Sequence, residues 1–131
     1  MNWLSKETEP TFIRISGDGN YPMDIVGEAN YQSELDGLTG GKTEDGHHLK
    51  AEAMLILENS NPYDDKAVAV SINGDIVGYL SRQRARDHRD LIGLTEFPDA
   101  TTIVNALITG GWRRGSGEEG HYGVKLDMPI N

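Results

Sequence analysis

The stretch that decides the fold is Ala67-Val68-Ala69-Val70-Ser71-Ile72-Asn73-Gly74-Asp75-Ile76-Val77-Gly78-Tyr79-Leu80. Two apolar runs rich in β-branched residues flank Asn73-Gly74, a dipeptide typical of a type I′ hairpin turn because both central positions need positive φ. The stretch therefore predicts a β-hairpin with strands at 67–72 and 75–80. A two-residue turn would place Val70 opposite Val77 and Val68 opposite Tyr79, with Tyr79 on the face of those valines.

Strands and turns continue on both sides of this hairpin. We expect strands at 12–15, 23–27, 49–58, 101–109 and 122–128, separated by polar or glycine-rich turns such as 42–48 and 110–120. Tyr31, Leu35 and Leu38 at i, i+4 and i+7 predict a helix over 31–38. Ser81 is a suitable N-cap for a second helix that ends near Ile92. About six strands with two short helices predict a mainly β fold, a small OB-like β-barrel.

Length and composition place the chain in one domain. It has 131 residues, 37% of them apolar, with 16 glycines and no cysteine, so disulfides and thiolate sites are excluded. We expect residues 1–20 to form a partly mobile N-terminal extension with a short strand, and residues 21–131 to form a single domain. The N-terminus lacks a signal-peptide pattern, and no apolar run could span a membrane, so we expect a soluble, cytoplasmic monomer.

The net charge of −9 argues against generic nucleic-acid binding, because a negative body repels phosphate. Six of the seven arginines nevertheless fall between Arg82 and Arg114. Exposed charges further apart than a Debye length of about 8 Å are largely screened from one another. A local basic face can therefore coexist with an acidic body.

Catalytic and metal-binding signatures are missing from the sequence. There is no Gly-x-Ser-x-Gly, no phosphate-cradling loop with a lysine and no His-Glu-x-x-His. His47-His48 has no third ligand at a known spacing, and we interpret it as part of a polar loop. The sequence predicts a protein that is not an enzyme, with no cofactor and no metal.

The segment Asn61-Pro62-Tyr63-Asp64 is an unusual turn. Pro62 fixes its own φ and biases Asn61 towards an extended conformation, while Asn61 and Asp64 can bond nearby backbone N–H groups. Tyr63 is thereby presented on a stiff turn beside a carboxylate, which suits recognition of a ring plus a hydroxyl. The alternative is a turn whose tyrosine caps the barrel.

Two basic segments follow this turn. Arg82, Arg86 and Arg89 share one face of the second helix, which is either an anion site at a helix N-terminus or a solvated face. Trp112 precedes two arginines in a glycine-rich loop, where it can stack a base or fold back over the barrel mouth.

The order of several motifs resembles the HIRAN domain family, in its standalone bacterial or phage-type form. The motifs that carry the resemblance are Val26-Gly27-Glu28, Tyr31-Gln32, Glu58, Asn61-Pro62-Tyr63-Asp64, Ala67-Val68-Ala69-Val70, Gly74 and Val77-Gly78-Tyr79-Leu80-Ser81. The resemblance spans about residues 25–92, and the pairing of Asn-Pro-Tyr-Asp with Val-Gly-Tyr-Leu at this spacing is its most specific part.

The resemblance implies an OB-like barrel that binds single-stranded DNA at a free 3′-hydroxyl end, as an accessory to DNA repair or replication-fork processing. By analogy, Tyr63 and Asp64 would hold the terminal nucleoside, Arg82 a phosphate, and Trp112 a stacked base. The remaining candidate DNA contacts are Asn30, Tyr31, Tyr79, Arg86 and Arg113.

The chain also departs from the family pattern. DNA-binding members carry a basic residue and then an aromatic after Val-Gly, where this chain has Ala29 and Asn30 followed by Tyr31. One phosphate contact and one stacking surface are lost, so we expect weak binding of the DNA 3′ end, with another DNA-processing protein as a further expected partner. The alternative is a protein–protein interaction module that keeps the HIRAN fold without binding DNA.

Overall fold

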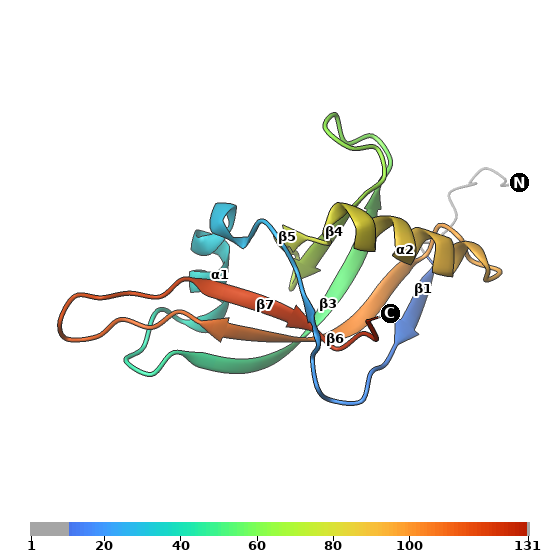
Figure 1. The fold of residues 1–131 in the computed structure, drawn as a ribbon. Coiled ribbons are helices and arrows are strands. Elements are labelled where there is room, and N and C mark those ends of the chain that lie inside the picture. Colours follow the sequence, from blue (N-terminus) through green and yellow to red (C-terminus); the bar gives the residue numbers. More distant parts are fainter. Residues whose placement is uncertain (1–10, 131) are drawn as a thin grey trace, which may run out of the picture.

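The computed structural model describes residues 11–130, which form one strongly curled sheet with two α-helices (Figure 1). The strands are β1 (Phe12–Ile15), β2 (Met23–Asp24), β3 (His47–Glu58), β4 (Ala67–Ile72), β5 (Asp75–Tyr79), β6 (Thr101–Gly110) and β7 (Tyr122–Leu126). The helices are α1 (Gln32–Thr39), α2 (Arg82–Gly93) and a 3-10 turn η1 (Glu28–Asn30). The predicted mainly β class with two short helices is confirmed.

Antiparallel pairing joins the strands in the order β2-β7-β6-β3-β4-β5. The segment that follows β2 connects the two edges of this sheet, β2 and β5. The Ile25 N–H donates to the Val124 carbonyl at 3.3 Å, while Val26 and Tyr79 exchange backbone hydrogen bonds of 2.8 and 2.9 Å. The sheet therefore curls into the small OB-like barrel that the sequence predicts.

β1 adds to this barrel from outside the antiparallel order. It pairs in parallel with the first part of β6, from Phe12 opposite Thr101 to Ile15 opposite Val104. β7 pairs only with the later part of β6, from Ala106 onward. β1 therefore pairs with the earlier part of β6, which β7 does not reach. The strand expected at 12–15 is confirmed. Of the partly mobile N-terminal extension expected at 1–20, residues 1–10 lie outside the described residues.

The hairpin turn has the predicted conformation, but the predicted register is wrong. Asn73 and Gly74 have φ values of 53° and 91°. A β-bulge then shifts the pairing, so that Val70 lies opposite Gly78 and not opposite Val77. By the same shift Tyr79 lies opposite Ala69, not Val68. The bulge brings the Val26 carbonyl so close that a Cβ at position 78 would lie 2.7 Å from it.

Several element boundaries also differ from the sequence-based expectations. β3 begins at His47, so the expected loop at 42–48 is shorter and His47-His48 belongs to a strand. β2 and β7 are shorter than the strands expected at 23–27 and 122–128. The segment 110–120 continues the β6–β7 hairpin, in which Arg113 forms a bridge with Glu119. Backbone pairing across this hairpin is the reason that the glycine-rich segment is not an open loop.

Both helices are held against the barrel by identifiable contacts. Gln32 of α1 accepts from the Tyr122 N–H at 2.8 Å and donates to the Tyr122 carbonyl at 3.1 Å. Ser81 caps α2 as predicted, its Oγ accepting from the Arg84 N–H at 3.3 Å. The buried side chains of α2 are Ala85, His88 and Ile92. This burial fixes which faces of α2 remain available for other contacts.

Candidate nucleic-acid interface

The connection between β3 and β4, residues 59–66, is called the β3–β4 loop below, and it projects from one end of the barrel (Figure 1). Within it, Asn61 Oδ1 accepts from the backbone N–H groups of Tyr63 and Asp64 at 2.9 and 3.1 Å. The Ala67 N–H donates to the Asp64 carbonyl at 3.0 Å. These bonds hold a tight turn on which the Tyr63 side chain is 93% exposed. Tyr63 does not cap the barrel.

Asp64 is the most constrained carboxylate of the loop. Arg86 donates to both of its oxygens, at 3.1 and 3.2 Å, and the Lys66 N–H donates to Oδ1 at 3.0 Å. The Arg82 Nε lies 3.6 Å from Oδ2. The Arg86 hydrogen bonds, followed by the bond from Lys66, lower the pKa of Asp64 to about 2. The carboxylate is therefore ionised at neutral pH, and Oδ2 keeps capacity for one further donor.

Glu58, at the end of β3, connects this loop to two tyrosines. Its Oε1 accepts from Asn61 Nδ2 and from the Tyr79 hydroxyl, both at 2.9 Å. Burial, and next the nearby Glu58 carboxylate, raise the pKa of Tyr79 above its usual range. The Tyr31 and Tyr79 rings lie 6.5 Å apart between centroids and are tilted by 44°. Both tyrosines are half-buried, so neither offers a fully open stacking face.

The three arginines on one face of α2 hold the β3–β4 loop from the other side. Arg89 donates to the carbonyls of Lys66 and Ala67 at 2.7 and 2.9 Å and to Asn59 Oδ1 at 2.8 Å. Arg86 is engaged with Asp64, as described above. Arg82 differs from them, because its side chain is 77% exposed. The stripe is thus mainly a clamp between α2 and the loop, with one arginine facing solvent.

Trp112 and Arg113 lie on a different part of the molecule. The β6–β7 hairpin that carries them extends away from the β3–β4 loop (Figure 1). The Arg114 guanidinium lies 4.2 Å from the centre of the Trp112 ring, and Arg113 pairs with Glu119 at 3.2 Å. The indole also packs so closely on Gly120 that a Cβ there would clash. Trp112 is therefore folded onto its own hairpin, and the expectation that it joins Tyr63 in one site is not met.

Six of the nine sequence-predicted contacts are connected through the β3–β4 loop and its supports: Tyr31, Tyr63, Asp64, Tyr79, Arg82 and Arg86. Asn30 is exposed at the end of η1, directly before Tyr31. Sequence reasoning did not assign the structural roles of Glu58 and Arg89. For Arg89, the available signal was its i, i+7 spacing from Arg82, which places both arginines on one face of the helix.

Comparison of the chain with protein-family models, curated proteins and solved structures finds no match. Among residues 11–130, no helix combines the length and apolar character needed to cross a membrane. Within the same residues, no three histidine or acidic side chains are grouped so that they could hold a metal ion. The function is therefore argued from the geometry of the β3–β4 loop.

Proposed function

We propose that this chain is a HIRAN-like, non-catalytic module that binds the 3′-hydroxyl end of single-stranded DNA, as an accessory to DNA repair or fork processing in the cytoplasm. The observation that carries the proposal is the presentation of Tyr63. A large aromatic ring that is 93% exposed stands beside an ionised carboxylate and an exposed arginine. Nucleobases stack on exposed aromatic rings of this kind.

Each of the three groups has a separate task in this proposal. The Tyr63 ring stacks on the terminal base, an interaction worth about 1–3 kcal/mol for a base on an aromatic side chain. The free acceptor position on Asp64 Oδ2 takes the hydrogen bond of the 3′-hydroxyl. Arg82 pairs with the phosphate that precedes the terminal nucleoside. Arg86 keeps Asp64 ionised and in place.

The same geometry limits the affinity. Arg86 and Arg89 are engaged with the protein itself, so Arg82 is the one arginine of the clamp left to bind phosphate. The charge of −9 opposes a polyanion at long range. We therefore expect dissociation constants in the micromolar range or weaker at physiological salt.

Replacement of Tyr63 tests the proposal. Tyr63→Ala should weaken binding of a short 3′-hydroxyl oligonucleotide about tenfold or more, because it removes the stacking surface. Tyr63→Phe keeps the ring and should bind within about twofold of the unchanged chain. Fluorescence anisotropy at low salt measures both, and equal affinities for Tyr63→Ala and the unchanged chain would contradict the proposal.

Arginine variants provide a matched comparison. The side chains of Arg82 and Arg113 are both mostly exposed, at 77% and 63%. Arg82 lies on α2, whereas Arg113 lies on the β6–β7 hairpin. Arg82→Gln should weaken DNA binding several-fold, whereas Arg113→Gln should change it little because Arg113 lies on the β6–β7 hairpin. An equal loss in the two variants would indicate non-specific attraction of the polyanion.

The second candidate function is a protein-interaction module. The observation that favours it is the engagement of Arg86 and Arg89 inside the molecule, together with the packing of Trp112 on Gly120 of its own hairpin. These features reduce the surface available to nucleic acid. A partner protein whose binding is unaffected by Tyr63→Ala, with no DNA binding at low salt, would favour this candidate.

A further inference from the structure

The first half of β3 is paired with a neighbouring strand on one side only. β6 pairs with β3 from His47 onward, whereas the pairing of β3 with β4 begins at Ala53. β4 reaches no further because the chain turns back at Asn73-Gly74. In the part of the chain that the structure describes, no other strand pairs with residues 47–52 on the side that β4 leaves. In Figure 1 this part of β3 borders the arm that it forms with β6 and β7.

The backbone hydrogen bonds of β6 show which residues of β3 this concerns. The Asp127 N–H donates to the Asn105 carbonyl at 2.9 Å, so Asn105 directs its polar groups to the side of β7. Neighbouring residues of a strand direct their backbone groups to opposite sides, so Ala106 bonds β3, where it lies opposite Ala51. Ala51 and every second residue along β3 from it therefore direct their backbone groups to β6.

The residues between them direct their backbone groups away from β6. In the unpaired half of β3 they are His48, Lys50 and Glu52, and this row is called the open side of β3 below. None of the three takes part in a backbone hydrogen bond outside the strand ladders, and all three are exposed. The open side thus presents three N–H groups and three carbonyls that have no protein partner within residues 11–130.

A row of unpaired backbone donors and acceptors specifies the conformation of its occupant. An extended strand is complementary to it, because the N–H and carbonyl groups of such a strand recur at the same spacing. In antiparallel pairing, each residue of the open side exchanges two hydrogen bonds with the residue opposite. Addition of a strand to a sheet edge in this way is a general mode of peptide recognition, in which main-chain bonds give affinity and alternate side chains give specificity.

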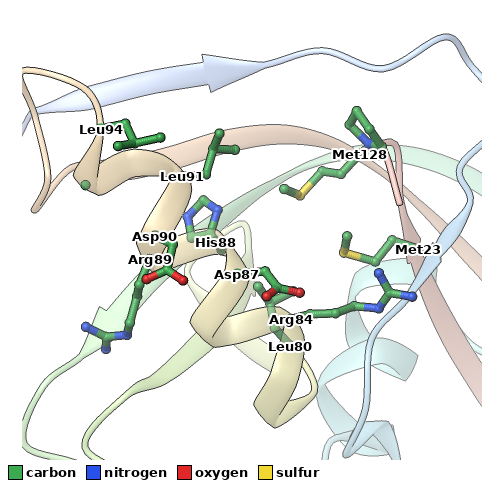
Figure 2. A pocket seen from close by; sticks show the side chains of 12 residues that line it. Met23, Leu80, Arg84, Asp87, His88, Arg89, Asp90, Leu91, Leu94 and Met128 are labelled. Carbon is green, nitrogen blue, oxygen red and sulfur yellow. The ribbon is translucent and has the colours of Figure 1, made fainter. Parts of the chain in front are cut away.

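The groove beside α2 lacks such a specification (Figure 2). Its lining combines apolar side chains with Arg84, Arg89, Asp87 and Asp90. Two charges of each sign select neither an acidic nor a basic partner, and no free backbone groups are presented there. The open side of β3 differs because the backbone itself determines what fits.

The charge of Lys50 argues against a second copy of the chain as the occupant. Antiparallel pairing of two copies through all three residues of the open side places Lys50 opposite Lys50 of the other copy, and like charges directly opposite each other destabilise a strand pair. A lysine on a free strand edge protects against self-association in this way. Within residues 11–130, Lys50 forms no ion pair, whereas Glu52 pairs with Arg14. A strand with a carboxylate opposite Lys50 replaces this repulsion by attraction.

The other face of the same segment adds an apolar contact. Leu49 is 41% exposed and shares a face of β3 with Ala53 and Leu55, which are buried. A residue of the added strand that lies opposite Leu49 would be on this face. The occupant is therefore expected to alternate apolar residues on this face with polar residues on the face of Lys50.

We propose that the open side of β3 binds an extended segment of a protein partner as an added β-strand. The segment carries an acidic residue opposite Lys50 and apolar residues on the face of Leu49. The site is separate from the proposed DNA site, because Lys50 and Glu58 lie about 26 Å apart along the strand at about 3.3 Å per residue.

Amide hydrogen exchange of the full ¹⁵N-labelled chain tests the proposal. The probe is an acetylated and amidated peptide, Val-Thr-Val-Glu-Val-Thr-Val, which reads the same in both directions. A twin with N-methylated backbone amides keeps every side chain but loses the backbone donors, and a third peptide has lysine in place of glutamate. In the free chain, the amide of Ala51 should exchange slowly and those of His48, Lys50 and Glu52 fast.

The first peptide should slow exchange of these three fast amides at least about tenfold, with saturable changes in their chemical shifts. The N-methylated twin should do neither, and the lysine peptide should bind more weakly than the glutamate peptide. Equal effects of the first peptide and its N-methylated twin would overturn the proposal, because strand addition requires the backbone donors.

Charge reversal distinguishes this site from a general attraction. Lys50→Glu should weaken binding of the glutamate peptide by about three- to tenfold and strengthen binding of the lysine peptide. Lys66→Glu is the matched control, because Lys66 is exposed in the β3–β4 loop, and it should leave both affinities unchanged. An unaltered preference for the glutamate peptide in Lys50→Glu would overturn the proposal. Protection of the three amides that rises with protein concentration alone would also overturn it, because it would assign the open side to a second copy.

Discussion

At the scale of single residues, paired side chains decide which groups remain available for binding. Asp64 is held by Arg86, and Tyr79 is held by Glu58, so both are fixed before any ligand arrives. Within residues 11–130, the Tyr63 side chain has no such partner, and it remains 93% exposed. Preorganisation of the neighbours around one exposed ring is what makes the turn a candidate binding site.

His88 gives a prediction for stability against pH. Burial, and next the charge of Arg89, lower the pKa of His88 from 6.5 to about 4. Between these values the unfolded chain binds a proton that the folded chain does not, so the free energy of unfolding falls as the pH falls from 6.5 towards 4. The contribution lost from this residue by pH 4.5 is about 2–3 kcal/mol.

Urea denaturation at pH 7 and pH 4.5 measures this effect. His88→Gln should reduce the difference in unfolding free energy between the two pH values by about that amount, since glutamine does not titrate. His48→Gln is the control, because His48 is exposed, and it should leave the difference unchanged. If His88→Gln shows the same loss of unfolding free energy between pH 7 and pH 4.5 as the unchanged chain, the prediction is contradicted.

At the scale of elements, the barrel depends on the close approach of β5 and the segment after β2. The contact is between the Val26 backbone and the bulged part of β5, where Gly78 leaves room. It places the end of β5, and therefore the start of α2, at the position from which the arginine clamp reaches the β3–β4 loop. A single glycine thus influences the geometry of the candidate site.

Gly78→Ala should reduce the free energy of unfolding by about 1–3 kcal/mol. The reason is that the new Cβ would lie 2.7 Å from both the Val26 carbonyl oxygen and the Ile25 Cδ1, and the backbone must shift to make room. Gly37→Ala is the matched control in α1, where a Cβ meets nothing within 4 Å. It should leave stability unchanged or raise it by up to about 1 kcal/mol. Thermal unfolding that ranks the two variants in the opposite order would refute this account.

The elements also show what the sequence can predict. The Asn73-Gly74 turn, the Ser81 cap and the Tyr63 turn are local, because neighbouring residues determine them, and all three are present. The bulge at Val77-Gly78, the parallel pairing of β1 with β6 and the contact through Val26 join residues far apart in the chain. No local pattern encodes such contacts, and the sequence did not predict them.

The same distinction separates the two parts of the candidate site. Tyr63 and Asp64 are neighbours on one turn, so their proximity follows from the sequence. Trp112 could join them only through the path of the β6–β7 hairpin, and that path depends on strand lengths and pairing. Arg89 was recognised as part of a stripe, but its clamp on the carbonyls of residues 66 and 67 required the docking of α2.

At the scale of the whole molecule, the proposed binding surface is small and lies on an acidic chain. The net charge of −9 opposes DNA, and Arg82 is the one arginine of the α2 clamp that is mostly exposed. If one or two phosphates are neutralised, the slope of log K against log salt for single-stranded DNA should be about −0.7 to −1.4. Anisotropy titrations between low and physiological salt measure this slope. A slope steeper than about −3 would indicate a much larger basic surface.

The most direct test of the central claim compares two oligonucleotides that differ only at their 3′ end. A 3′-hydroxyl end can donate a hydrogen bond to Asp64, whereas a 3′-phosphate cannot do so without bringing negative charge against an ionised carboxylate. Fluorescence anisotropy at low salt should therefore show about tenfold tighter binding of the hydroxyl oligonucleotide. Equal affinities for the two ends, or no binding of either, would contradict the proposed recognition of the DNA 3′ end.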